Sequence, residues 1–342
     1  MKKILVGVVA LVSLMSGQAS ADSGSAEALL HQMDKATAEL NYELSYIWVR
    51  KNSIEPLRFR HAIVDNHNFS QLAYLSGPPR EVIQRGHEVS YFEPGIEPFT
   101  IKSEAIVAPI PAVMQADIDD LAKYYDFISL GRAREAGLPC YVVRVVPKDG
   151  ERYSYVIWVD ERTKLLVRAD LLDRDGDPIE QYRTVSLVVT PKVGEAMKQL
   201  ETVKLPPVVD IPKAPNVALG WEVSKLPRGF KPVYQNRHRL LMTEKPVESQ
   251  MFSDGLFSFS VYLSKADQNS VNQQMVRQGR RTLHSFVVGN TEVTVVGDIP
   301  PDTARSVAES VRFISPAKIQ VDAKAEDASR QGKASQQVTV NQ

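Results

Sequence analysis

The sequence predicts an α+β fold that is mainly antiparallel β and is divided into two domains. Apolar and polar residues alternate along residues 41–50, and four strands joined by short polar turns follow between Cys140 and Val189. A strand spacing of about ten residues is typical of an antiparallel meander. A proline-rich stretch then precedes a second group of hairpins. The 342 residues and the hydrophobic fraction of 43% are sufficient for two cores.

Residues 1–21 have the features of a signal peptide. The basic start MKK precedes the apolar run ILVGVVALVSLM, which is too short to cross a membrane as a helix. The small residues of ASA, ending at Ala21, then form a cleavage site. We therefore expect cleavage after Ala21 and export of a soluble protein. Cys140 is the single cysteine, so no internal disulfide can form.

The first domain is expected to span residues 22–203 and to begin with an amphipathic helix over residues 25–40. One face of this helix is apolar and contains Leu29, Met33, Ala36 and Leu40. Strands are expected at residues 41–50 and 58–65. Residues 81–95, EVIQRGHEVSYFEPG, predict a hairpin that turns near Gly86.

Residues 93–114, which we call the lid, are both apolar and rich in proline. Proline fixes φ and removes a backbone donor, so we expect no regular element here. The apolar side chains predict instead that the lid covers or enters something apolar. A short helix should follow, with Ile118, Leu121 and Tyr125 on one side.

The meander from Cys140 consists of the runs CYVVRVVP, ERYSYVIWV, KLLVRADLL and PIEQYRTVSLVV. In the third run Leu165, Val167 and Ala169 share one face. Arg168 and Asp170 lie on the other face. One apolar and one mixed face indicate a curved sheet that is covered on one side.

Residues 204–219 are expected to form an extended interdomain linker, because four prolines fall within 204–215. The second domain should span residues 220–316. It shows hairpin turns at Asp254-Gly255 and Gly289-Asn290, and a helix in PDTARSVAESV that begins at a proline. The tail, residues 317–342, is polar and lacks aromatic residues, so we expect it to be disordered.

The acidic stretch DLLDRDGDPIEQY, residues 170–182, allows three interpretations. A calcium loop starting at Asp173 would need glycine at its sixth position and glutamate at its twelfth, but Pro178 and Thr184 stand there. A glycosidase-type carboxylate pair would need a cleft. Flanking strands and Gly176 favour a solvated hairpin turn instead.

Other catalytic or metal-binding patterns are incomplete in this sequence. His87-Glu88 begins like a zinc-protease motif, but Tyr91 stands where the second histidine belongs. Cys140 has no basic neighbour within two positions, which favours an inert buried thiol. The sequence therefore predicts a protein that is not an enzyme, with no catalytic residue, no metal and no cofactor.

Two features favour binding. The first is the set of aromatic and aliphatic residues in the first sheet and the lid. If helices cover a curved sheet, these residues can line a cavity that suits an acyl chain. The alternative is an ordinary hydrophobic core, which would have the same composition. The lipid-binding candidates are Tyr46, Trp48, Phe92, Phe99, Ile106, Ile110, Val113 and Met114. The second domain carries 12 Lys and Arg against 9 Asp and Glu. Arginine suits the recognition of phosphate and carboxylate groups. The candidates for partner or phosphate binding are therefore Arg237, Arg239, Arg277, Arg280 and Arg281. The alternative is that these side chains are ordinary solvated surface charges.

Several long runs resemble one family of periplasmic sigma-E regulators, RseB, called MucB in pseudomonads. These runs are LNYELSYIWVR, EVIQRGHEVSYFEPG, YYDFISLGR, DGERYSYVIWVDERTKLLVRADLLDRDGD and SDGLFSFSV. The resemblance extends over about residues 26–313 and implies a first domain like the lipoprotein carriers LolA and LolB, a half-open barrel with covering helices.

The resemblance also implies a function. The second domain would bind the periplasmic region of the anti-sigma factor RseA and shield it from the site-1 protease DegS. Lipopolysaccharide or another acylated signal would release the shield, and the protein would form a homodimer or a larger assembly in the periplasm. No nucleic acid is expected as a partner. The alternative is a soluble periplasmic carrier of lipids or lipoproteins, which the apolar lid favours.

Overall fold

The computed structural model describes residues 23–107, 109–209, 217–239, 246–268, 270 and 272–314. The predicted signal peptide, the predicted disordered tail and the middle of the predicted linker lie outside the described residues. No helix among the described residues is long and apolar enough to cross a membrane.

The first domain comprises eleven strands, three α-helices and two short 3₁₀ helices. Its helical elements are α1 (Ser23–Glu39), η1 (Ala112–Met114), α2 (Ile118–Leu121), α3 (Pro191–Met197) and η2 (Lys198–Glu201). Its strands are β1 (Tyr42–Arg50), β2 (Ser53–Val64), β3 (His67–Tyr74), β4 (Glu81–Arg85), β5 (Glu88–Phe92), β6 (Phe99–Lys102), β7 (Tyr125–Glu135), β8 (Leu138–Pro147), β9 (Ser154–Asp160), β10 (Leu166–Leu172) and β11 (Pro178–Val189).

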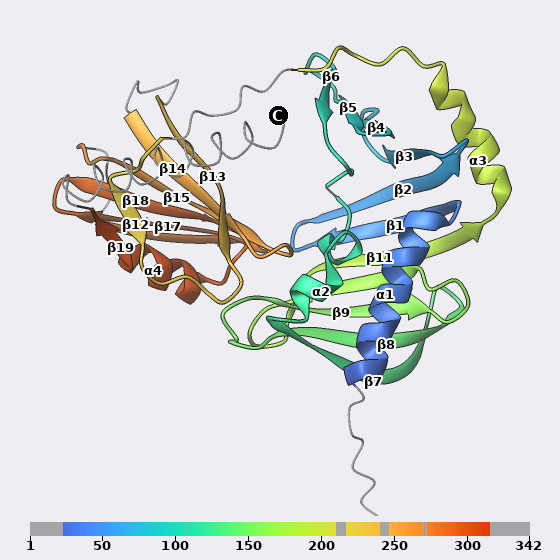
Figure 1. Ribbon diagram of the computed structural model, residues 1–342, viewed down its shortest axis with the longest axis horizontal. Coiled ribbons are helices and arrows are strands. Elements are labelled where there is room, and N and C mark those ends of the chain that lie inside the picture. Colours follow the sequence, from blue (N-terminus) through green and yellow to red (C-terminus); the bar gives the residue numbers. More distant parts are fainter. Residues whose placement is uncertain are drawn as a thin grey trace, which may run out of the picture.

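These strands form one antiparallel sheet in the order β6-β5-β4-β3-β2-β1-β11-β10-β9-β8-β7. The register shifts by one residue at several points, including Ser45/Tyr46 of β1 and Leu166/Arg168 of β10. Such bulges increase the local twist and bend a strand. The sheet therefore curls around α1, which crosses its concave side (Figure 1). The predicted half-barrel with covering helices is confirmed.

The predicted amphipathic helix is present as α1, but of its predicted face Leu29 is only half-buried and Leu40 follows the end of the helix. Its buried face contains Ala26, Leu30, Met33 and Ala36, at the spacing that a helix needs to present one side to a sheet. On β1 the alternation predicted from the sequence buries Tyr42, Leu44 and Tyr46. A separate small core lies between α3 and β2–β4 and contains Ala62, Phe69, Ile83, Val193, Met197 and Leu200.

In its described residues the second domain contains a six-stranded antiparallel sheet, a two-stranded sheet and one helix. Its elements are β12 (Trp221–Val223), β13 (Lys231–Arg239), β14 (Pro246–Ser253), β15 (Ser258–Lys265), β16 (Gln273–Gln278), β17 (Arg281–Val288), β18 (Thr291–Gly297), α4 (Pro301–Glu309) and β19 (Val311–Phe313). The larger sheet has the order β13-β14-β15-β18-β17-β16, and β12 pairs with β19. Both predicted hairpins and the predicted helix are present.

One apolar core continues from the first domain into the second. The ring of Phe257 stacks on Tyr155 at a centroid distance of 6.0 Å and meets the edge of Tyr153 at 6.1 Å. The Tyr153 hydroxyl donates to the carbonyl of Ile299 (3.2 Å), and Thr303 donates to the carbonyl of Glu151 (2.6 Å). The two domains therefore pack directly against each other (Figure 1).

The structure differs from the sequence prediction in several segments. The elements β3, α3, β13 and β16 were not predicted, and Tyr125, expected on the short helix, begins β7 instead. The strand β7 was not predicted, because its second half carries Gly131 and charged residues in place of an alternating pattern. The lid contains a short strand, β6, although no regular element was expected there. The linker is docked where it begins, since the backbone N–H of Val209 donates to the Thr100 carbonyl of β6 (2.7 Å) and Val208 forms a parallel bridge with Thr100.

Candidate ligand-binding site: an apolar cavity and an interdomain cleft

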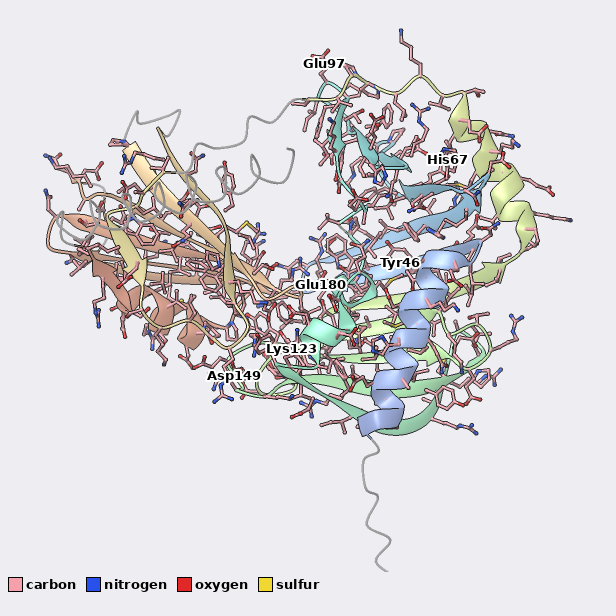
Figure 2. The ribbon with its side chains drawn as sticks, in the orientation of Figure 1. Tyr46, His67, Glu97, Lys123, Asp149 and Glu180 are labelled. Carbon is pink, nitrogen blue, oxygen red and sulfur yellow. The ribbon has the colours of Figure 1, made fainter. Side chains whose placement is uncertain are left out.

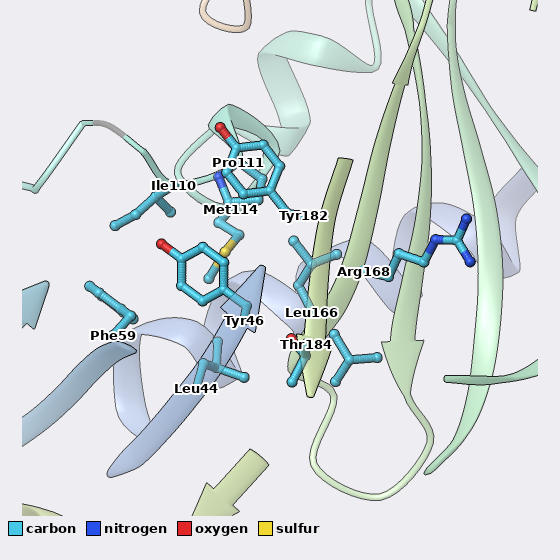
Figure 3. Close-up of a pocket in the computed structure, with 11 residues that line it drawn as sticks. Leu44, Tyr46, Phe59, Ile110, Pro111, Met114, Leu166, Arg168, Tyr182 and Thr184 are labelled. Atoms are coloured by element: carbon cyan, nitrogen blue, oxygen red, sulfur yellow. The ribbon is translucent and has the colours of Figure 1, made fainter. Parts of the chain in front are cut away.

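An apolar cavity lies between the curved sheet and the lid (Figure 3). Its lining residues are Leu44, Tyr46, Phe59, Ile110, Pro111, Met114, Leu166, Val167, Arg168, Tyr182 and Thr184. The Tyr46 hydroxyl donates to the Pro109 carbonyl (2.7 Å), which ties β1 to the lid. The Arg168 guanidinium points away from the other lining side chains and pairs with Asp170, with 2.9 Å between Nε and Oδ1.

The cavity measures about 20 Å³, roughly the room that one buried water needs. An acyl chain therefore cannot enter while the lid is closed. Because the lining is almost entirely apolar, opening the lid would expose a surface suited to a hydrocarbon chain.

The lipid-binding candidates are placed in different surroundings. Tyr46, Ile110 and Met114 line the cavity. Ile106 and Val113 are buried in the same core but do not line the cavity. The other three candidates, Trp48, Phe92 and Phe99, lie elsewhere.

Phe99 stacks on Tyr91 at the β6 edge, with 5.1 Å between ring centroids. Phe92 packs against the small core under α3. Trp48 lines a second and larger cavity. The sequence identified these three residues as aromatic, but the alternation along the strands did not show which face of a strongly curved sheet each one occupies.

The larger cavity, which we call the interdomain cleft, has a volume of about 640 Å³. Its lining residues are Trp48, Arg50, Lys51, Asn52, Ser53, Ile179, Glu180, Arg277, Gln278, Gly279, Arg280, Arg281 and Asp298. The first domain contributes the β1–β2 turn and the start of β11, and the second domain contributes the β16–β17 turn. The cleft thus brings one lipid candidate together with three of the arginine candidates.

These three arginines form ion pairs within the chain. Arg277 reaches Asp173 (3.4 Å), and Arg280 lies 3.2 Å from Asp298 and 3.7 Å from Glu180. Arg281 lies 3.7 Å from Asp298, and 69% of its side chain is exposed. The Arg277–Asp173 and Arg280–Glu180 pairs join the two domains.

Arg280 remains charged in this setting. Its partial burial lowers the pKa of the guanidinium, but Asp298, Tyr155 and Glu180 outweigh burial and raise the pKa above its usual value. Arg280 therefore contributes a positive charge to the lining of the cleft, next to two carboxylates.

The remaining arginine candidates do not join this group. Arg237 pairs with Glu248, its Nε lying 2.8 Å from Oε1. Both Arg237 and Arg239 belong to β13, at the edge of the six-stranded sheet opposite to β16. The side chain of Arg239 lies outside the described residues. The five arginine candidates thus lie in two separate places, the interdomain cleft and the β13 edge of the second sheet.

Glu180 is the residue of this site that sequence reasoning missed. Its carboxylate is 4% exposed and accepts hydrogen bonds from the Trp48 indole and the Tyr182 hydroxyl (2.8 Å). Figure 2 shows Glu180 on the side of the first domain that faces the second. The available signal was its position two residues before Tyr182, on the buried face of β11, where a carboxylate needs a partner.

The acidic stretch is a turn, as predicted. Gly176 has a φ of +90°, and the Asp173 carboxylate accepts from the backbone N–H groups of Asp175 (3.1 Å) and Asp177 (3.0 Å). The expectation of solvated acids is wrong for Asp173, whose side chain is 14% exposed and pairs with Arg277. The turn contributes to the domain contact.

Two other groups could in principle carry chemistry, a thiol and a cluster of possible metal ligands. Cys140 is buried, and burial raises the pKa of its thiol to about 11, so the thiolate is scarce near neutral pH. On the outer surface of the described chain Glu27, His31 and Asp119 have ligand atoms within 4.8 Å of one another. His31 on α1 lies 3.3 Å from Asp119 on α2, so this group of residues is explained as a contact between the two helices.

The comparisons with known proteins agree with this architecture. A family model described as the MucB/RseB N-terminal domain matches residues 25–209, and one described as the MucB/RseB C-terminal domain matches residues 215–312. The Sigma-E factor regulatory protein RseB of Salmonella typhimurium is 48% identical over 309 residues, which cover 90% of this chain and 96% of that protein. The protein of the same name from Escherichia coli K12 is 46% identical, with coverages of 88% and 94%.

Solved structures show the same fold. The complex of Pseudomonas aeruginosa MucA and MucB contains a chain that matches with a TM-score of 0.69 at 24% identity, over 85% of this chain and 99% of that one. A structure of MucB bound to MucA(peri) matches with a TM-score of 0.65 and the same coverage. With both family models and these relatives in agreement, the chain belongs to the MucB/RseB family.

Proposed function

We propose that this protein is a periplasmic regulator of the sigma-E envelope stress response. In this role it binds the periplasmic region of the anti-sigma factor RseA and shields it from the site-1 protease DegS. The observation that carries the proposal is the 48% identity to a Sigma-E factor regulatory protein over 96% of that protein's length. The solved complexes of MucB with MucA support binding of a partner protein by this fold.

Release of the shield by an acylated, phosphate-bearing lipid such as lipopolysaccharide is the second part of the proposal. The apolar lining under the lid would suit an acyl chain once the lid opens, and the interdomain cleft carries arginines that suit phosphate. The apolar start of the chain supports export to the periplasm, and assembly as a homodimer is proposed on the resemblance alone.

The decisive experiment measures cleavage of the RseA periplasmic region by DegS. With the purified mature protein in excess, cleavage should slow by about tenfold or more, and lipopolysaccharide should restore the original rate. A heat-unfolded sample of the same protein is the control for non-specific protection. Undiminished cleavage in the presence of folded protein would refute the shielding role.

A soluble carrier of lipids or lipoproteins is the second candidate function, because an apolar cavity lies beneath the lid. It predicts that the protein extracts lipidated cargo from one membrane and delivers it to another. Vesicles with a fluorescent acylated peptide test this directly. Transfer that is no faster than spontaneous exchange would remove this candidate and leave the regulatory proposal intact.

A further inference from the structure

We propose that the interdomain cleft is a binding site for a phosphate group, and that the bound phosphate replaces the Glu180 carboxylate as the partner of Arg280. The inference rests on the proposed function, because it assigns a position to the headgroup of the acylated signal.

The charges that line the cleft favour an anion. Five cationic side chains line it, against two carboxylates, and two of the cations, Arg50 and Arg277, also pair with Glu55 and Asp173 beside it. The cations come from two turns, the first at the end of β1 and the second between β16 and β17. They are Arg50, Lys51, Arg277, Arg280 and Arg281. A guanidinium presents a planar fork of donors that matches two oxygens of a phosphate, so this set suits a phosphate better than a single small anion.

Some of these cations are available to a ligand. Arg281 is 69% exposed and shares the carboxylate of Asp298 with Arg280. Lys51 is exposed on the opposite side of the cleft. A phosphate with nearly two negative charges can therefore bind to Lys51 and Arg281 first, and then compete for Arg280.

Competition for Arg280 affects the domain contact. The Arg280–Glu180 pair (3.7 Å) crosses from the second domain to the first. When Arg280 turns to a phosphate, Glu180 still accepts hydrogen bonds from Trp48 and Tyr182, so the buried carboxylate keeps partners. The contact between Arg152 and Asp254 does not face the cleft and stays in place. The ligand thus loosens one part of the interface and leaves another intact.

The cleft and the apolar cavity share one wall. Tyr182 lines the cavity and donates to Glu180, and the ring of Trp48, which lines the cleft, stacks on Tyr182 with 5.8 Å between centroids. One ligand can therefore place an acyl chain under the opened lid and its phosphate in the cleft. Both groups would act on Glu180, the first through Tyr182 and the second through Arg280.

Indole N–H signals in nitrogen-15 NMR test this inference without any partner protein. The chain has three tryptophans, and Trp48 is the one that lines the cleft. We expect titration of the mature protein with pyrophosphate, or with dihexanoyl phosphatidate below its micelle concentration, to shift the Trp48 signal in a saturable way. The signals of Trp158 and Trp221 should stay in place.

Charge-removing variants identify the site. Lys51→Gln combined with Arg281→Gln changes two exposed side chains, so the fold should be preserved, and affinity for both phosphate probes should fall about tenfold or more. Arg312→Gln is the matched control, because Arg312 is an exposed arginine of the second domain that lies outside the cleft. Its affinities should stay within about twofold of the wild type.

The outcomes separate the possible sources of phosphate. If dihexanoyl phosphatidate binds more tightly than pyrophosphate, one ligand uses both the cavity and the cleft. Equal affinities would support the phosphate site but would refute the claim that the acyl chain binds in the adjoining cavity. Absence of a saturable Trp48 shift with either probe overturns the whole inference. The inference is also refuted if the double variant binds the phosphate probes with unchanged affinity, or if dihexanoyl phosphatidylcholine binds as tightly as dihexanoyl phosphatidate. Protease shielding is measured separately, so failure of one proposal is not failure of the other.

Discussion

At the scale of single residues, the carboxylate of Asp254 in the second domain contacts two buried side chains of the first domain. Its side chain is fully buried at the β14–β15 turn. One carboxylate oxygen accepts from Tyr125 (2.6 Å) and Arg152 (2.8 Å), and the other accepts from the backbone N–H groups of Leu256 (2.9 Å) and Phe257 (2.7 Å). Burial, followed by the charge of Asp254, raises the pKa of Tyr125, so its hydroxyl remains a donor.

Asp254→Ala should lower the free energy of unfolding by about 3–5 kcal/mol, because it leaves the buried guanidinium of Arg152 with only Asp149 as a carboxylate partner. Urea unfolding followed by circular dichroism measures this. Asp175→Ala is the matched control at an exposed turn and should change stability by less than about 0.5 kcal/mol. A loss below about 1 kcal/mol for Asp254→Ala would show that the carboxylate is not important for the contact.

The sequence identified Ser253-Asp254-Gly255 as a turn but gave no sign of its ion pair. Arg152 lies 102 positions earlier in the chain, and no local pattern relates the two residues. The same holds for Glu180 and Arg280. A buried charge needs a partner, but only the packing of the domains determines which partner it finds.

At the scale of elements, the lid is the part of the fold that must move for an acyl ligand. Prolines exclude a long regular element there, as the sequence predicted. Ile106, Ile110, Val113 and Met114 enter the core, whereas Ile96 and Val107 are exposed. The short strand β6 was not predicted because four residues give too little alternation to detect. One hydrogen bond from Tyr46 to the Pro109 carbonyl fastens the lid to β1.

Tyr46→Phe should make lid opening easier by about 1 kcal/mol, because it removes this hydrogen bond and keeps the ring. Hydrogen exchange in peptides that cover residues 109–115 should speed up about fivefold, since 1.4 kcal/mol corresponds to tenfold. Tyr234→Phe, at an exposed tyrosine of the second domain, is the control. Equal exchange in all three proteins would show that the hydrogen bond does not hold the lid.

At the scale of the whole molecule, the two domains share one continuous apolar core. Phe257 of the second domain packs between Tyr153 and Tyr155 of the first. Because burial of a phenylalanine stabilises by several kcal/mol, the domains should not unfold independently.

Calorimetry should therefore show one cooperative transition for the wild type. In Phe257→Ala the contact loses about 3–5 kcal/mol, and the single endotherm should separate into two. Phe313→Ala provides the control, because Phe313 belongs to the same domain but is 58% exposed. A single transition retained by Phe257→Ala would mean that other contacts couple the domains.

Local patterns by themselves determined the elements of this protein. Alternation along residues 42–48, turn residues at Gly176 and Gly255, and the spacing of apolar residues in α1 are short-range signals, and each one specified a strand, a turn or a helix face. Long family-like runs identified the family. These features depend on neighbours in sequence, which is why they could be predicted without coordinates.

The tertiary structure alone decided how these elements combine into sites. The bulges at Ser45/Tyr46 and Leu166/Arg168 bend the sheet. Domain packing places Trp48 and Glu180 beside Arg280, from parts of the chain that are about a hundred or more positions apart. Curvature and long-range charge pairing arise from the packing of the whole chain, so no stretch of sequence contains them.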